Sequence, residues 1–145
     1  MPGWAPWLLA GGVVLAAVAG WVLRRRAAEG DPRPRGGDIW WARVPYADGT
    51  GAKLRPCLVL RRRRQGVLVL KITSQDKSHR RDHILIPTRS WDPRARRDSY
   101  LNLGEPVLVR HDAFQRRAGR ADRATLRRVA LGRAARRGTR SGPAR

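Results

Sequence analysis

The chain has 145 residues, a length that suits one folded domain, and its single cysteine, Cys57, excludes an internal disulfide and agrees with a reducing compartment. It has 32 Lys and Arg against 11 Asp and Glu, which gives a formal net charge of +21, and all but three of the basic residues are arginine. The sign of this charge favours anionic partners, either nucleic acid or anionic lipid, over cationic ones.

Residues 2–23 carry no charged side chain, and Arg24, Arg25 and Arg26 follow at once. About 20 apolar residues at about 1.5 Å each cover the hydrocarbon core of a bilayer, so the sequence predicts a transmembrane anchor with its basic flank over residues 1–26. Because basic flanks stay on the cytoplasmic side, the rest of the chain is expected to face the cytoplasm as a single-pass membrane protein. The alternative is a cleaved signal peptide, for which 17–19 (Ala-Val-Ala) offers a cleavage site, although the basic n-region is missing.

Residues 27–37 are rich in Pro, Gly and charge and read as a linker, so the folded domain is expected over residues 38–137. Short apolar and β-branched runs predict strands at 39–44, 57–60, 67–72 and 83–86, with a further strand at 100–103 or 107–109. Residues 46–53 have the composition of a loop, and the arginine-rich stretch 61–66 is expected to form the tip of a hairpin. Cys57 lies in one of the apolar runs and is interpreted as a core residue.

A helix is predicted over residues 121–137, with Asp122 as its N-cap. Leu126, Val129, Ala130 and Ala134 recur at helical spacing and form the face that should pack on the sheet. Residues 138–145 lack apolar side chains and are expected to be a disordered basic tail. The fold class predicted is therefore mainly β (α+β), a small barrel or strongly bent sheet with a C-terminal helix.

The sequence offers few sites for catalysis. Its three histidines and one cysteine show no zinc-ligand spacing, and it has neither a Gly-rich phosphate loop nor a G-x-S-x-G motif, so no metal or cofactor is predicted. What remains is Arg55 at the start of one strand and the polar string 73–79 (Thr-Ser-Gln-Asp-Lys-Ser-His) at the end of the next. Pairing of these two strands could bring them into one pocket.

Three segments in this order resemble the MazF/PemK (Kid) toxins of bacterial type II toxin-antitoxin systems. They are 37–41 (Gly-Asp-Ile-Trp-Trp), 55–60 (Arg-Pro-Cys-Leu-Val-Leu) and 72–75 (Ile-Thr-Ser-Gln). The resemblance implies an SH3-like barrel of the MazF/CcdB type, a homodimer, a cognate antitoxin, and metal-independent cleavage of single-stranded RNA by transesterification. By motif, Arg55 corresponds to the catalytic arginine of the family and Thr73 to its catalytic threonine.

Chemistry supports these two positions, because a guanidinium fork can neutralise two phosphate oxygens while a hydroxyl donates to a third or holds the 2′-oxygen. His79 or Asp76 could assist proton transfer. The alternatives are an ion pair of Arg55 with a carboxylate such as Asp38 or Asp48, and a turn role for the Thr73 hydroxyl. The predicted substrate-binding residues are Trp41, Lys53, Ser74, Gln75, Lys77 and His79.

The function expected is that of a membrane-tethered endoribonuclease. The alternative is a non-catalytic module of the same fold that binds RNA, a protein partner or an anionic membrane surface, the last through the arginines of the helix and tail. A third hypothesis is a toxin that acts on gyrase, as the CcdB toxins of the related fold do. Of the adjacent residues Trp40 and Trp41, strand alternation should bury one and leave the other available to stack on a base.

Overall fold

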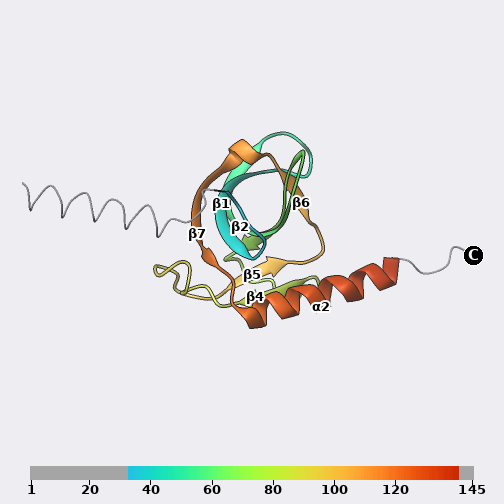
Figure 1. The fold of residues 1–145 in the computed structure, drawn as a ribbon. Helices are drawn as coiled ribbons and strands as arrows, with labels where there is room; N and C mark the ends of the chain where they lie inside the picture. The colour runs from blue at the N-terminus through green and yellow to red at the C-terminus, as the bar shows by residue number, and fades with distance from the viewer. Residues whose placement is uncertain (1–32, 141–145) are drawn as a thin grey trace, which may run out of the picture. The chain divides into compact units, whose positions relative to one another are not determined.

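A computed structural model describes residues 33–140 of the chain, and the predicted membrane anchor at 1–26 lies outside them. Among the residues described, no helix is long and apolar enough to cross a bilayer. Residues 33–140 form, in chain order (Figure 1), seven strands, one 3₁₀ turn and one helix. They are β1 (Asp38–Pro45), β2 (Ala52–Arg63), β3 (Gly66–Thr73), β4 (His83–Ile86), β5 (Ser99–Asn102), β6 (Val107–Val109), η1 (His111–Ala113), β7 (Phe114–Arg120) and α2 (Arg123–Arg140).

Every strand predicted from the sequence is present, and the two alternatives near residue 100 are both strands, β5 and β6. The hairpin loops are shorter than expected because β2 extends beyond its apolar run at both ends. β2 begins at Ala52, within the expected loop, and it continues to Arg63, so the turn to β3 is only two residues long. The polar ends of β2 form a strand because β1 and β3 supply backbone partners for them.

The strands pair antiparallel in the order β4-β5-β3-β2-β1-β7, and β6 pairs with β3. One edge of β3 is divided between two neighbours, since Val67, Leu68 and Val69 face β6 whereas Ile72 and Thr73 face β5. The sheet is strongly curved (Figure 1). Its end strands β4 and β7 do not pair with each other among the described residues, so the barrel that the resemblance implies is not closed by hydrogen bonds. At the β4 edge, the Arg128 guanidinium of the helix donates a 2.8 Å hydrogen bond to the Leu85 carbonyl oxygen.

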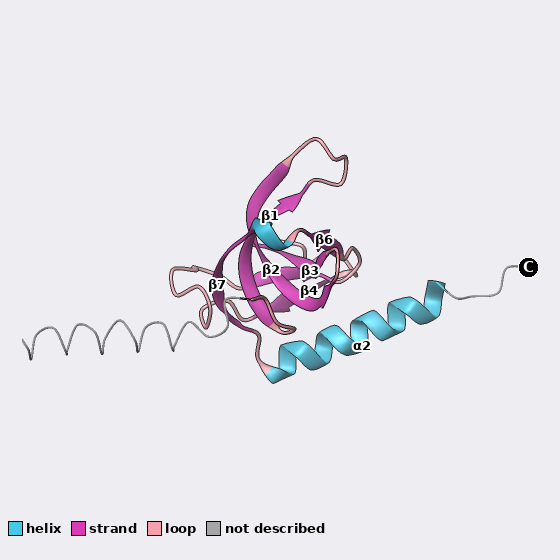
Figure 2. Ribbon diagram, turned by 45° about the horizontal axis from the view of Figure 1, so that its top comes forward, coloured by secondary structure: helices cyan, strands magenta, loops and turns pink. Residues whose placement is uncertain are grey.

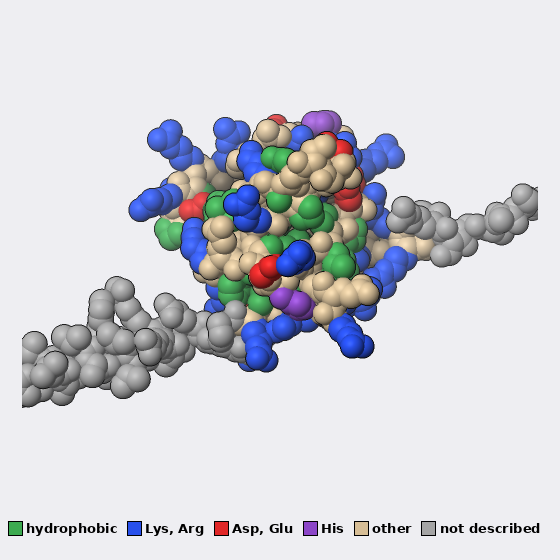
Figure 3. Space-filling model, turned by 90° about the horizontal axis from the view of Figure 1, so that it is seen from above, with side chains coloured by type: hydrophobic (Ala, Val, Ile, Leu, Met, Phe, Trp, Pro, Cys, Tyr) green, Lys and Arg blue, Asp and Glu red, His purple; other side chains and the backbone are tan. Residues whose placement is uncertain are grey.

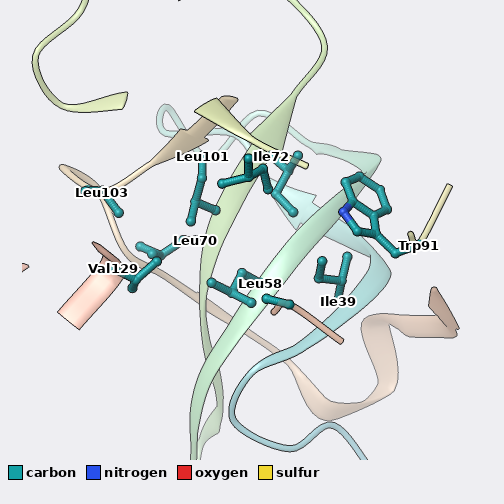
Figure 4. Close-up of a cluster of buried hydrophobic side chains, with 10 residues drawn as sticks. Ile39, Leu58, Leu70, Ile72, Trp91, Leu101, Leu103 and Val129 are labelled. Atoms are coloured by element: carbon teal, nitrogen blue, oxygen red, sulfur yellow. The ribbon is translucent and has the colours of Figure 1, made fainter. Parts of the chain in front are cut away.

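Both faces of the central strands are buried, each in its own cluster. Trp40, Ala42 and Val44 of β1 point into a cluster with Cys57 and Val59 of β2. The alternate residues of these strands point the other way, into a second cluster (Figure 4) that contains Ile39, Leu58, Leu70, Ile72, Ile86, Trp91, Leu101, Leu103, Ala121 and Val129. Because both faces of these strands are covered, the run at 57–60 is apolar throughout, and the run at 67–72 is apolar except for Lys71, which pairs with Glu105. Cys57 is confirmed as a core residue, fully buried, and its burial raises the pKa of its thiol to about 12.

Strand β7 was not foreseen from the sequence, because Phe-Gln-Arg-Arg-Ala-Gly-Arg has neither strand alternation nor an apolar run. It pairs with β1 through two register irregularities. Ion pairs add to this pairing, since Arg117 and Arg120 contact the buried Asp38 carboxylate at 3.0 and 3.3 Å. Tertiary partners therefore stabilise a segment whose local sequence does not favour a strand.

Helix α2 lies along one side of the curved sheet as a second layer (Figure 2). The predicted N-cap is confirmed, because the Asp122 carboxylate accepts a 2.7 Å hydrogen bond from the Thr125 backbone N–H. Val129 is buried in the cluster of Figure 4, and Leu126 packs against it. The helix starts at Arg123 and continues to Arg140, so residues 138–140, expected in the disordered tail, belong to its last turn.

Candidate active site

The candidate site lies where β2 and β3 separate. Their last paired residues at this end are Cys57 and Lys71, and the same register continued by two residues sets Arg55 against Thr73. At that point β2 pairs with β1, Arg55 facing Ala42, while β3 turns to β5. Since the two strands follow different neighbours, a groove opens between them with Arg55 and Thr73 on its two sides.

This groove has a volume of about 410 Å³. The predicted residues Trp41, Lys53, Arg55, Thr73, Ser74 and Gln75 all line it, and the other lining residues are Leu54, Pro56, Ile72, Trp91, Asp92 and Ser99. Lys77 and His79 are not among the lining residues. Proximity in sequence to Thr73 therefore does not bring these two side chains to the groove wall.

Arg55 is half-buried and forms no ion pair or side-chain hydrogen bond within the described part of the chain, and its Nε is buried without a partner. The carboxylates considered as its partners are used elsewhere. Asp38 pairs with Arg117 and Arg120, and Asp48 accepts hydrogen bonds from the Thr50 backbone and hydroxyl at 3.0 and 2.7 Å. A structural ion pair therefore does not account for Arg55, and a buried unpaired donor is the kind of group that an anionic ligand satisfies.

The Thr73 hydroxyl has a structural role as well as a position in the groove. Its oxygen accepts a 3.2 Å hydrogen bond from the backbone N–H of Gln75, as the turn interpretation expects. That bond uses the oxygen only as an acceptor, so the hydroxyl proton remains available for a ligand. The turn thus fixes the direction of a hydroxyl that could still donate to a phosphate.

Next to Thr73, the structure reveals a polar group that the sequence did not single out. Tyr100 is the cross-strand partner of Thr73, and its hydroxyl is close enough to the Asp76 carboxylate for the two groups to shift each other's pKa. Asp76 also accepts a 2.8 Å bond from the Ser78 backbone N–H, which is the main cause that lowers the pKa of Asp76, so this carboxyl stays ionised at neutral pH. Burial, followed by the neighbouring Asp76 carboxylate, raises the pKa of Tyr100. Asp76 can therefore accept a proton but is not a proton donor.

The two tryptophans of β1 divide as alternation predicts. Trp40 is buried and meets Phe114 edge to face, with ring centroids 6.0 Å apart. Trp41 is half-buried on the groove wall, and the Arg116 guanidinium from β7 lies 5.3 Å from the centroid of its ring. This arrangement leaves an aromatic surface beside a cation, which suits stacking of a nucleobase next to a phosphate.

Two residues of the opposite wall, Trp91 and Asp92, come from the connection between β4 and β5 and were also missed. No local pattern marks them, because they reach the groove only through the pairing of β5 with β3. Among the described residues, no group of three or more His, Cys, Asp or Glu side chains could hold a metal ion. The groove instead offers a guanidinium, a lysine ammonium and hydroxyls, a set that suits a phosphate group.

Comparison with known families agrees with the site. A model described as PemK-like, MazF-like toxin of type II toxin-antitoxin system matches residues 35–132, a range that covers the whole sheet, the groove and the first half of α2. No curated protein matches the chain. Because the family match spans well over half of the chain and includes both Arg55 and Thr73, which line the groove, the chain belongs to the PemK/MazF-like toxin family.

Proposed function

We propose that this chain is a metal-independent endoribonuclease that cleaves single-stranded RNA, with Arg55 and Thr73 as its catalytic residues. The observation that carries the proposal is the unpaired Arg55 guanidinium, whose Nε is buried without a partner on the wall of a groove that Thr73 also lines. A guanidinium held in this way is ready to bind a phosphate without first breaking an ion pair.

The family supports this reading. Its members are typically mRNA interferases, metal-independent endoribonucleases that bind RNA and an antitoxin and are typically dimeric. We extend homodimer formation and binding of a cognate antitoxin to this chain on the same basis.

In the proposed reaction, the 2′-hydroxyl of the RNA attacks the adjacent phosphorus and the bond from phosphorus to the 5′-oxygen breaks. The products are a 2′,3′-cyclic phosphate and a free 5′-hydroxyl, and the proton lost from the 2′-oxygen is balanced by the one gained by the 5′-oxygen. Arg55 would bind two phosphate oxygens and stabilise the charge that grows on them, while Thr73 would donate to a third oxygen or hold the 2′-oxygen. Trp41 would stack on a neighbouring base, and Lys53, Ser74 and Gln75 would contact the strand.

The test compares the full-length chain with Arg55→Ala and Thr73→Ala on end-labelled single-stranded RNA in EDTA. Arg62→Ala is the matched control, because Arg62 is exposed at the far end of β2 and does not line the groove. We expect each groove variant to lose at least about 100-fold in cleavage rate, the typical effect of removing a transition-state donor, and the control to cut normally. Cleavage that persists in both groove variants would reject the assignment.

The same experiment separates the enzyme from a binding module. If the unmodified chain binds RNA but does not cut it, the domain is a non-catalytic RNA-binding module; if it does neither, a protein partner or an anionic membrane surface becomes the better candidate ligand.

Tethering at a membrane through residues 1–26 is a further part of the proposal and rests on the sequence alone. Flotation of the full chain with vesicles, compared with a chain that begins after residue 26, tests it.

A further inference from the structure

The connection between β4 and β5 carries a concentration of positive charge that the proposed chemistry does not use. Residues 87–98 contain four exposed arginines, Arg89, Arg94, Arg96 and Arg97. We call the segment 87–98 the arginine loop. Lys and Arg side chains stand out around the molecular face in Figure 3, so charge alone does not distinguish this loop and its structure must be considered.

The arginine loop is held in shape by its own contacts. Trp91 is 6% exposed and donates a 2.9 Å hydrogen bond from its indole nitrogen to the Pro87 carbonyl oxygen. Thr88 is buried, and its hydroxyl oxygen accepts a 2.8 Å bond from the Ser99 backbone N–H, which joins the two ends of the loop. In Figure 4 the Trp91 ring lies beside Ile39 and Ile72, so the loop is anchored in the core. The backbone that carries the arginines is therefore held in place next to the groove wall.

The two carboxylates of the loop serve its backbone. Asp92 accepts a 3.2 Å hydrogen bond from the Arg94 N–H, and Asp98 accepts a 3.1 Å bond from the Thr88 N–H. None of the four loop arginines takes part in an ion pair recorded among residues 33–140. The loop therefore presents cations that are not committed to a partner in the fold.

The backbone positions of the arginines lie close to the groove in sequence and in space. Asp92 and Ser99 both line it, and the chain between them is a short excursion that begins and ends on the groove wall. Arg94 is two residues from Asp92, and Arg97 is two residues from Ser99, so each Cα lies within about 7.6 Å of the Cα of a lining residue. A strand bound at Arg55 that leaves the groove on this side would pass these cations.

Building on the proposed function, we propose that the arginine loop binds phosphates of the same RNA strand that neighbour the cleaved phosphate. The substrate site would then extend beyond the groove. The loop offers guanidinium groups, and none of the large exposed apolar side chains of residues 33–140 belongs to it, which matches a repeating phosphate backbone better than the apolar centre of a protein interface. Such contacts contribute affinity without sequence preference, because phosphates are the same at every nucleotide.

The test measures RNA binding by the full-length chain carrying Thr73→Ala, which should prevent cleavage during the measurement. In this background, the four loop arginines are changed to glutamine, and the matched control changes Arg61, Arg62, Arg63 and Arg64 to glutamine. The control removes the same charge at the opposite end of the β2–β3 hairpin. Affinity for a single-stranded 20-mer and for a trinucleotide is measured over a range of salt concentrations.

For single strands, the slope of log K against log salt concentration changes by about 0.7 for each phosphate contact, so loss of four contacts lowers its magnitude by up to about 2.8. We expect a drop of this order for the 20-mer with the loop variant, a much smaller drop with the control, and no difference for the trinucleotide. Replacing the four arginines with lysine should restore most of the slope, and circular dichroism should show that all variants are folded.

If the salt slope for the 20-mer falls equally in the loop variant and in the control, the proposal is overturned, because the fall would then depend only on the total charge removed and not on its position. An unchanged affinity for the 20-mer would also overturn it and would direct attention to a protein partner. Failure of the proposed function is detected separately, as a lack of RNA cleavage by the unmodified chain. A chain that binds RNA without cutting it still allows the salt slopes of the loop variant and the control to be compared.

Discussion

Replacing Arg55 with methionine should make the protein more stable while it abolishes cleavage. A buried donor without a partner costs about 1–3 kcal/mol, and because the Arg55 side chain is only partly buried we take the lower end, about 1 kcal/mol. Methionine keeps an unbranched stem of similar length without the polar head. For a domain of this size the gain corresponds to a rise in Tm of about 4 °C or more.

The assay is thermal denaturation of the full-length chain in a buffer without phosphate, followed by circular dichroism, with RNA cleavage measured on the same preparations. Arg117→Met is the matched control, because the Arg117 guanidinium is bound to the buried Asp38 carboxylate at 3.0 Å. Its loss should destabilise the protein by about 1–3 kcal/mol, since it leaves a buried charge with fewer partners. The control therefore shifts Tm in the opposite direction.

Inorganic phosphate provides an independent readout of the same reasoning. A ligand that binds only the folded state raises stability in proportion to RT ln(1 + [L]/Kd), so phosphate should raise the Tm of the unmodified chain and of Arg117→Met more than that of Arg55→Met. The argument fails if Arg55→Met lowers Tm as much as Arg117→Met does, because Arg55 would then be part of the structural framework.

Three further predictions concern stability and reactivity. Gly66→Ala should cost at least about 2 kcal/mol in urea denaturation, because a Cβ at this position would lie 2.5 Å from the Val109 carbonyl oxygen. The Cys57 thiol should react with a disulfide reagent only as fast as the protein unfolds, because the side chain is fully buried and its pKa is raised to about 12; rapid reaction of the folded protein would contradict its core position. Asp122→Ala should cost about 1 kcal/mol, because it removes the 2.7 Å cap to Thr125. Since that cap lowers the pKa of Asp122 below 3.8, the difference between the two proteins should be present at neutral pH and vanish as pH falls through the folded-state pKa, as urea denaturation over a pH series would show.

The strands that could be predicted are those whose side chains enter the two buried clusters. The run at 57–60, and the run at 67–72 apart from Lys71, are apolar on both faces, and Pro or Gly marks where several strands end, so local sequence was sufficient. Strand β7 could not be predicted, because its stability depends on the distant Asp38 carboxylate and on pairing with β1. The limits of β2 were missed for a related reason, since its polar ends become strand only when neighbours pair with them.

The candidate site divides in the same way. Arg55 and Thr73 were found from sequence motifs, and the hairpin register that sets them face to face is local. The opposite wall, Trp91 and Asp92, and the Tyr100 neighbour of Thr73 depend on the pairing of β3 with β5, which lie far apart in sequence. The local sequence does not indicate a contact of that kind. Conversely, sequence proximity wrongly suggests that every residue of the string 73–79 lines the same groove.

Gly119 has a consequence for the order in which the site is completed. A Cβ at this position would lie 2.8 Å from the Cβ of Trp91, so strand β7 and the groove wall are fitted against each other at a point where only glycine leaves room. During synthesis Arg55 and Thr73 leave the ribosome early, but Gly119, which packs against Trp91, is made 46 residues after Thr73. We therefore expect a nascent chain to carry the reactive side chains for some time before it has a groove in which they can act, so that a chain interrupted before Phe114 is harmless to RNA.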